Sequence, residues 1–215
     1  MTFAKEAWPF VLPFVVVAVA ALALRRPVLA AVLAAIALAV LLFFRIPSRS
    51  SQADERIVLA PANGRITSIE TVTDPDFAEG RFYRVVTFLS VFNVHVQRAP
   101  VAGEVIATHY RRGRKVAAFR PDAGEINESR LAVMRTDEGD TIGVQQLAGL
   151  VARRVVTYLE EGDLVERGDL IGVIKFGSRV DLYLPTHYRL LVEKGQTVHE
   201  GQTAMATSEA RREAK

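Results

Sequence analysis

The sequence predicts a mainly β protein, in which a β-sandwich or barrel-like soluble domain follows an N-terminal apolar helical hairpin. Two observations predict this fold: the first 45 or so residues contain two uninterrupted apolar runs, and the remaining runs are short and rich in Val, Ile, Tyr and Phe. Short runs separated by Gly, Pro, Asp and Asn are typical of all-β domains. We therefore expect an anchoring hairpin at residues 1–46, a polar linker at 47–54 and a β-rich catalytic domain at 55–215.

The hairpin is expected from the apolar runs at residues 7–24 and 27–44, which contain no charge and are separated by Arg25 and Arg26. As a helix, each run would extend about 27 Å, which is enough for a thin hydrocarbon core. The second run argues against a cleaved signal peptide. A transmembrane hairpin is favoured, and a shallow pair of helices in the membrane interface is the alternative, because Pro9, Pro13 and the arginine pair suit it.

The domain after the linker is expected to consist of short strands. A helical period is suggested only at residues 145–154. The expected strands are at residues 56–59, 65–72, 82–88, 104–109, 131–135, 141–146, 151–159, 170–175, 180–184 and 189–192.

Two pairs of similar phrases occur within this domain. Residues 161–169 resemble 193–202, and residues 61–66 resemble 100–105. Their glycines suit tight β turns, because glycine adopts positive φ without a steric penalty. Biotinyl and lipoyl carrier domains have similar phrases at their hairpins. We interpret the phrases as β-sandwich turns and not as a functional repeat.

Composition excludes several classes of site. The chain has no cysteine, so disulfides, thiolate metal sites, cysteine nucleophiles and iron–sulfur clusters are excluded. The 27 Lys and Arg residues slightly exceed the 24 Asp and Glu residues, but no basic stretch is interleaved with aromatics, so no nucleic-acid partner is expected. Basic residues flank the apolar runs, which fits an anionic membrane surface. Metal-ligand spacings are also missing from the sequence, and we expect no metal.

Two residues stand out as candidates for chemistry. His95 lies between apolar residues near the end of an expected strand, whereas His109, His187 and His199 are expected at strand ends, loops or turns. Ser178 follows a glycine within residues 174–181 (IKFGSRVD), a pattern that suits either an ordinary turn or a self-cleavage point. Taken alone, a satisfied core histidine and a turn serine are the simpler interpretations.

Four phrases together change this interpretation: PANGRI at residues 61–66, VFNVHVQRAP at 91–100, NESR at 127–130 and FGSRVD at 176–181. With them the chain resembles the short bacterial and archaeal form of phosphatidylserine decarboxylase, a pyruvoyl enzyme. The phrases have the order found in that family and extend over residues 56–206, most of the soluble domain.

The resemblance implies that the precursor cleaves itself between Gly177 and Ser178. In such a reaction the serine hydroxyl attacks the glycine carbonyl, β-elimination releases the upstream chain, and the remaining dehydroalanine hydrolyses to a pyruvoyl group and ammonia. The chain would then consist of subunits 1–177 and 178–215. The pyruvoyl group of Ser178 would form a Schiff base with phosphatidylserine and accept electrons as carbon dioxide leaves, which yields phosphatidylethanolamine. His95 would be the general base.

Asn63 departs from the family, which has an aspartate at this place in an Asp-His-Ser arrangement. In serine proteases the equivalent change lowers turnover about 10⁴-fold. We therefore predict a slow or trapped precursor. Asn63 is an engineered change, or a natural one for which Asp181 or Glu128 substitutes, or it deamidates or is tolerated.

The resemblance also implies partners and a location. Phosphatidylserine and membrane lipids are the expected ligands, and Arg98, Arg112 and Arg179 are candidates for binding the lipid phosphate. We expect the large and small subunits to stay together, to form a homodimer, and to act at the cytoplasmic face of the inner membrane. Two alternatives remain. One is a non-enzymatic, membrane-anchored adaptor or carrier-like module, although no carrier lysine phrase is present. The other is a pyruvoyl decarboxylase for a soluble amino acid, against which the apolar segment argues.

Overall fold

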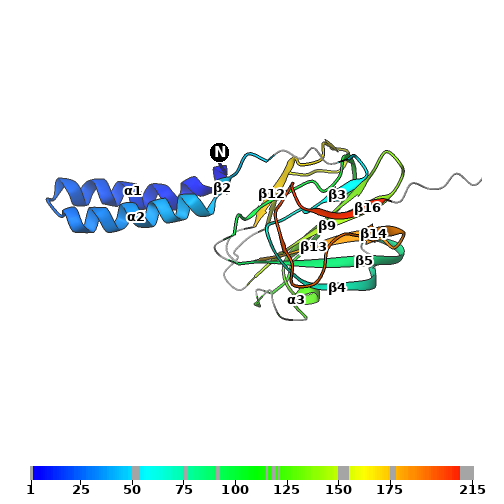
Figure 1. The fold of residues 1–215 in the computed structure, drawn as a ribbon. Helices are drawn as coiled ribbons and strands as arrows, with labels where there is room; N and C mark the ends of the chain where they lie inside the picture. Colours follow the sequence, from blue (N-terminus) through cyan, green and yellow to red (C-terminus); the bar gives the residue numbers. More distant parts are fainter. Residues whose placement is uncertain are drawn as a thin grey trace, which may run out of the picture. The chain divides into compact units, whose positions relative to one another are not determined.

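The structure, a computed structural model, describes residues 2–49, 54–74, 77–90, 93–114, 116–117, 120, 122–149, 155–174 and 178–208. Glu125 and Ser178 are described by their backbone alone, and Gly177 lies outside the described residues. Contacts within the chain divide it into two compact units, Met1–Ser48 and Arg49–Lys215, which are described separately (Figure 1).

The first unit is a pair of apolar helices, α1 (Trp8–Ala23) and α2 (Pro27–Phe43), preceded by the 3₁₀ turn η1 (Lys5–Ala7). Short strands β1 (Thr2–Phe3) and β2 (Arg45–Ile46) pair antiparallel at its open end. The helices lie side by side (Figure 1). Within the described residues, one helix, Lys5–Ala23, is long and apolar enough to cross a membrane by length and composition. The predicted helical hairpin is confirmed.

The turn between the two helices uses a left-handed residue. Arg25 has φ of 56°, and the Arg26 N–H donates to the Ala21 carbonyl at 2.8 Å. Helices commonly end with such a residue, which is usually glycine. The arginine pair therefore closes the turn and also places two cations at its tip.

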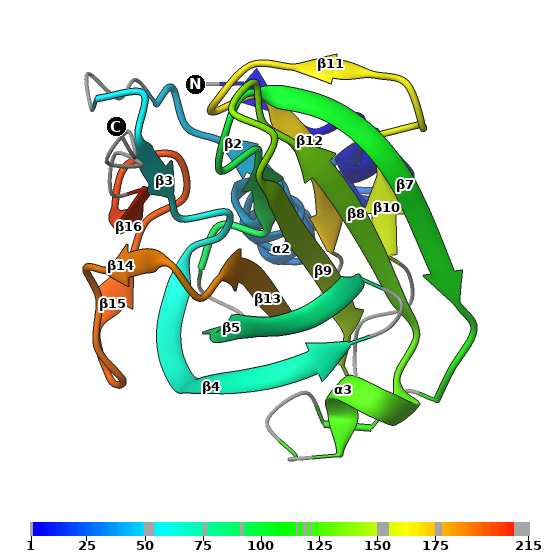
Figure 2. The same cartoon turned by 90° about the vertical axis from the view of Figure 1, so that its right-hand side faces the viewer.

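The second unit is built around one antiparallel sheet of eight strands, which curls in space (Figure 2). Strand β13 lies inside the sheet and pairs with β5 on one side and β9 on the other. In spatial order the strands are β11 (Leu164–Val165), β7 (Gly103–Arg111), β8 (Ser129–Arg135), β9 (Thr141–Ala148), β13 (Ser178–Pro185), β5 (Ala78–Leu89), β4 (Gly64–Asp74) and β15 (Thr197–Val198).

Two smaller sheets and a short helix complete this unit. One sheet has the order β10 (Val155–Thr157), β12 (Leu170–Ile174) and β6 (Val96–Arg98). The other has the order β14 (Tyr188–Leu190), β16 (Ala204–Ser208) and β3 (Ile57–Leu59). Helix α3 (Ala123–Ile126) lies in the connection between β7 and β8.

The large sheet has an inner and an outer face, because side chains alternate along each strand. Val180, Leu182 and Leu184 of β13 belong to the main core, together with Ile171 and Met205 of the two small sheets. We call this face the inner face. Full burial of each large apolar side chain contributes roughly 1.5–3 kcal/mol. A second, smaller apolar cluster lies on the outer face and consists of Phe77, Phe82, Leu131, Val133 and Tyr183.

The two pairs of similar phrases form equivalent structures. The Gly195 N–H donates to the Ile66 carbonyl, and the Gly162 N–H donates to the Val105 carbonyl. Each glycine lies in the turn before a two-residue strand. These strands, β15 and β11, pair with the first residues of β4 and β7. A Cβ at Gly64 or at Gly103 would lie 2.2 Å from a carbonyl oxygen of the neighbouring strand, so both strands need glycine where they begin. The phrases are therefore structural turns, in two matched copies.

The mainly β prediction is confirmed, and most expected strands are present with extended ends. The helical period suggested at residues 145–154 is wrong where the structure describes it, because Thr141–Ala148 is a strand. Its run of buried side chains reflects burial on both faces of the sheet and not a helix. Strands β6, β11, β15 and β16 were not predicted, since runs of two to five residues carry too little pattern.

Candidate active site

Ser178 is the first residue of β13 and lies well inside the large sheet. It pairs with Leu89 of β5 and with Ala148 of β9. The Ala148 N–H in turn donates to the Glu128 carbonyl at 2.9 Å. Ser178 therefore belongs to a row of residues that crosses the end of the sheet, and the cleavage point expected at Gly177 directly precedes that row.

The loop that carries His95 contacts the chain shortly before this point. The His95 backbone carbonyl accepts the Ile174 N–H at 3.0 Å, so the last described residue before the expected cut lies beside His95. The imidazole is fully buried, and its Nδ1 is 2.8 Å from the Asn93 carbonyl oxygen. Because a carbonyl only accepts, neutral His95 carries its hydrogen on Nδ1. Its Nε2 then has the lone pair that a general base requires.

A chain of buried amide side chains connects His95 to the large sheet. Gln97 Nε2 donates to the His95 carbonyl at 2.8 Å, and Gln146 Nε2 donates to Gln97 Oε1 at 2.7 Å. Gly172 leaves room for this contact, since a Cβ there would lie 2.6 Å from Gln146 Nε2. Hydrogen-bonded buried networks hold their members rigidly. The loop that carries His95 is thus fastened to the inner face of the sheet.

A cavity of about 430 Å³ opens between β7, β8 and β10. Gln146 and Arg130 are cross-strand partners, and Arg130 lines this cavity. The Arg130 guanidinium lies 5.3 Å from the centre of the Tyr110 ring. The lining residues are Tyr110, Glu128, Arg130, Val155, Val156 and Thr157.

Asn63 is buried in a different cluster. Its Oδ1 lies 3.2 Å from His199 Nδ1 and 3.2 Å from the Glu200 backbone nitrogen, and it accepts from both. These are the polar contacts described for the Asn63 side chain, and His95 is not among them. Burial raises the pKa of the Glu200 carboxyl, and the neighbouring Arg49 at 3.3 Å opposes that shift. Asn63, which the sequence suggested as a partner of His95, therefore hydrogen-bonds to a different histidine, His199.

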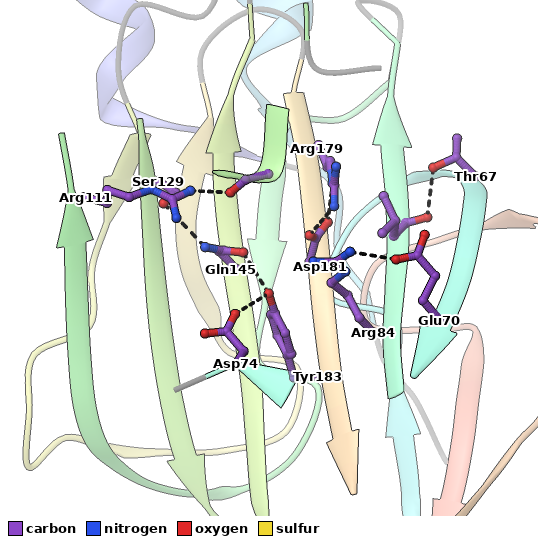
Figure 3. Close-up of polar contacts among 12 residues, drawn as sticks. Thr67, Glu70, Asp74, Arg84, Arg111, Ser129, Gln145, Arg179, Asp181 and Tyr183 are labelled. Carbon is purple, nitrogen blue, oxygen red and sulfur yellow. Dashed lines mark hydrogen bonds and ion pairs between the residues drawn. The ribbon is translucent and has the colours of Figure 1, made fainter. Parts of the chain in front are cut away.

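The three candidate arginines lie in three different environments. Arg98 is half-buried beside the cluster of Asn63, His199, Glu200 and Arg49, which we call the Glu200 cluster. Its guanidinium donates to the Gly168 carbonyl at 2.7 Å. Arg112 is exposed after β7. Arg179 lies on the outer face, and its guanidinium donates two hydrogen bonds of 2.7 and 2.6 Å to the Asp181 carboxylate (Figure 3). Arg179 is only 6% exposed, so its charge is already compensated inside the protein.

The outer face carries a wider polar network around this ion pair (Figure 3). Arg84 binds Glu70 at 2.6 Å on the neighbouring strands. The Tyr183 hydroxyl lies 3.0 Å from both Asp74 and Gln145. Burial raises the pKa of Tyr183, and the nearby aspartates raise it further, so the hydroxyl remains a donor. Helix α3 covers part of this face, where Arg111 donates to the Gly124 carbonyl (Figure 3).

The structure thus brings His95 and the chain before Ser178 together and places Asn63 in a separate cluster. Sequence reasoning missed Asn93, Gln97, Gln146 and Arg130 as parts of the site. The available signal was polar residues at inward positions of strands, since a buried amide needs a hydrogen-bonding reason to be there.

Comparison with known proteins agrees with the earlier resemblance. The family profile described as phosphatidylserine decarboxylase matches residues 36–206. A phosphatidylserine decarboxylase proenzyme of Symbiobacterium thermophilum is 44% identical over 202 residues, which cover 94% of each chain. The proenzyme of Magnetococcus marinus is 40% identical over 94% of this chain and 93% of its own length. The proenzyme of Gluconobacter oxydans is 45% identical over 77% of this chain and 75% of its own length.

Proposed function

The chain belongs to the phosphatidylserine decarboxylase family and is a decarboxylase, and from that premise we propose that it converts phosphatidylserine to phosphatidylethanolamine with a pyruvoyl group made from Ser178. The relatives are named proenzymes, which supports maturation by cleavage. The observation that carries the proposal is the contact between His95 and Ile174, four residues before Ser178.

The residues near the cut fit the formation of such a group. Ser178 starts an internal strand that is held on both sides, so its backbone position is fixed. His95 is buried and has the tautomer with an accepting Nε2. This tautomer is set by the Asn93 carbonyl, which has the orienting role that a carboxylate has in a hydrolase triad. Self-cleavage requires a base within reach of the serine hydroxyl, and the bond between His95 and Ile174 supports such a placement.

We propose the following sequence for the cleavage. The Ser178 hydroxyl loses its proton to His95 and its oxygen bonds to the Gly177 carbonyl carbon. The bond from that carbon to the Ser178 nitrogen then breaks, and His95 returns the proton to that nitrogen, which leaves as an amine. Loss of the Ser178 Cα proton then breaks the Cβ–O bond and releases chain 1–177 with a carboxylate end. Water adds to the remaining chain and ammonia leaves. When present, the pyruvoyl carbonyl supplies an electron acceptor for decarboxylation.

We further propose that the protein acts at a membrane. Helix Lys5–Ala23 supports this by its length and composition, and both helices expose large apolar side chains. A membrane anchor would hold the site near the head-group layer, so that a two-tailed lipid need not enter water. The cytoplasmic face of the inner membrane, the homodimer and the lasting association of the two subunits remain our predictions.

The intact mass of the full-length protein, purified in detergent and measured under denaturing conditions, tests the cleavage. We expect chains 1–177 and 178–215, the second without an N-terminal amine, and a single uncut chain for Ser178→Ala. Ser208→Ala is the matched control and should be cleaved normally. A cleaved Ser178→Ala variant, or a parent that stays uncut yet decarboxylates phosphatidylserine, would contradict the proposal.

A further inference from the structure

The cavity beside β8 lies on the same face of the large sheet as the main core. Arg130 pairs with Gln146, which pairs with Val180, and Val180 is a member of the main core. Ser178 comes two residues before Val180 and therefore has the same place in the alternation of β13. Glu128 belongs to the Ser178 row through Ala148. The cavity thus adjoins the row in which the pyruvoyl group would form.

Among the residues that the structure describes, two charged side chains of the cavity have no compensating partner. Within the described part of the chain, Arg130 has a ring contact to Tyr110 and no ion pair or hydrogen bond from its guanidinium. The Glu128 carboxyl also has no described side-chain partner, although the residue is only 9% exposed. Charged groups that are removed from water are normally paired, so an unpaired cation and anion in one cavity indicate a ligand that carries both charges.

The separation between these groups and Ser178 suits a phospholipid head group. Arg130 is two strands across from Ser178 and two residues along the sheet. At about 4.8 Å per strand and about 3.4 Å per residue, their Cα atoms are about 12 Å apart. Four bonds separate phosphorus from the amino nitrogen in a phosphoserine head group. An extended arginine side chain and such a head group together span this distance.

We propose that this cavity is the head-group subsite, in which Arg130 binds the phosphodiester of phosphatidylserine and Glu128 accepts a hydrogen bond from its amino group. The inference rests on the proposed function, because it assumes that Ser178 becomes the reacting group. Guanidinium binds phosphate through two parallel hydrogen bonds, and the Tyr110 ring beneath Arg130 holds the guanidinium plane in place. Glu128, in the Ser178 row, lies on the reactive side of the phosphate.

The other arginines fit this role less well. Arg179 faces away from the cavity and is neutralised by Asp181. Arg98 lies in the Glu200 cluster, which also contains Arg49. Arg112 is exposed and is the alternative phosphate-binding arginine that the experiment must exclude.

The test is steady-state decarboxylation of phosphatidylserine in detergent micelles by the full-length, cleaved protein. Arg130→Gln should raise KM roughly 10- to 100-fold, the loss expected for a hydrogen bond to a charged group, and change kcat little. Glycerophosphoserine, which is the head group without acyl tails, should inhibit the parent competitively and inhibit Arg130→Gln much less. Arg130→Lys should recover part of the loss, because it keeps the charge but not the paired hydrogen bonds.

Arg135→Gln, an exposed arginine at the other end of β8, is the matched control and should behave as the parent. Intact mass and circular dichroism check that each variant is cleaved and folded. A cleaved, folded Arg130→Gln variant with unchanged KM, or a KM increase in Arg112→Gln instead, overturns the subsite. A parent that stays uncut yet decarboxylates phosphatidylserine overturns the proposed function itself, and the mass spectrum separates these two failures.

Discussion

At the scale of single residues, His95 depends on its own loop for orientation. The Asn93 carbonyl fixes the hydrogen on Nδ1, so the wrong-tautomer penalty that follows an Asp-to-Asn change in serine proteases does not apply here. What Asn63 lacks is negative charge. Residue 63 precedes β4, which is two strands from β13, so a charge there would lie about 10 Å from the strand that begins with Ser178.

Asn63→Asp should therefore accelerate self-cleavage by about one order of magnitude, because a charge at 10 Å contributes about 1.7 kcal/mol at an effective dielectric constant of 20. The measurement is the rate at which uncut chain disappears after synthesis in vitro. Leu164→Glu adds the same charge at an exposed position of β11, at the other edge of the sheet, and should have no effect. Equal rates for the parent and Asn63→Asp would show that charge at this position does not assist cleavage.

Asp181 and Arg179 form the most buried ion pair described on the outer face. Asp181→Ala leaves an unpaired buried guanidinium and should lower the free energy of unfolding by about 3–5 kcal/mol. The measurement is denaturant unfolding in an uncut Ser178→Ala background. Glu70→Ala breaks the more exposed pair with Arg84 and should cost less than about 1 kcal/mol. Similar losses in the two variants would show that burial does not set the strength of the Arg179 pair.

Only some residues of the candidate site were predictable from the sequence. Ser178 and His95 stood out through phrases shared with a family, whereas Asn93 acts through its backbone carbonyl, which any residue at that position would supply. Arg130 was not distinguishable from a solvated arginine, because its importance comes from the cavity that β10 closes. Arg179 was a reasonable phosphate candidate by sequence, but in the structure its guanidinium binds Asp181, which neutralises its charge.

At the scale of elements, alternation explains why β13 is well defined. Val180, Leu182 and Leu184 fill the core, while Arg179, Asp181 and Tyr183 make the outer polar network. Such a two-sided strand was predictable from sequence. Strands of two or three residues, such as β11 and β15, exist because they complete the edges of long neighbours, and no local pattern announces them.

The helix pair gives an element-scale prediction. Val16 lies near the middle of α1 and is 64% exposed. Val16→Lys should weaken association with lipid vesicles strongly, since a lysine at the centre of a membrane helix costs about 2.5–3.5 kcal/mol. The measurement is cosedimentation with vesicles. Leu164→Lys, at an exposed position of β11, is the control and should bind as the parent does. Unchanged sedimentation of Val16→Lys would place α1 outside the lipid.

At the scale of the whole molecule, the second unit contains two matched copies of one turn arrangement. The Leu59 N–H donates to the Pro100 carbonyl, and the Arg98 N–H donates to the Pro61 carbonyl, so the copies exchange equivalent bonds. The similar phrases predicted the turns, but not that the copies bind each other. That relation arises from long-range packing, which a pattern within one segment does not contain.

The internal position of β13 has a last consequence, which concerns folding. Cleavage after Gly177 would make residues 178–215 a separate peptide, yet β13 would keep its bonds to β5 and β9. Unfolding of the uncut precursor is unimolecular, so its midpoint should not change with dilution. Unfolding of the cut protein separates two chains, so its midpoint should fall as the protein is diluted. Denaturant titrations at two protein concentrations measure this difference, and a cut protein whose midpoint ignores dilution would contradict it. Maturation would thus turn a folding equilibrium into an association equilibrium, and a mature enzyme that lost its small chain could not make another from the same polypeptide.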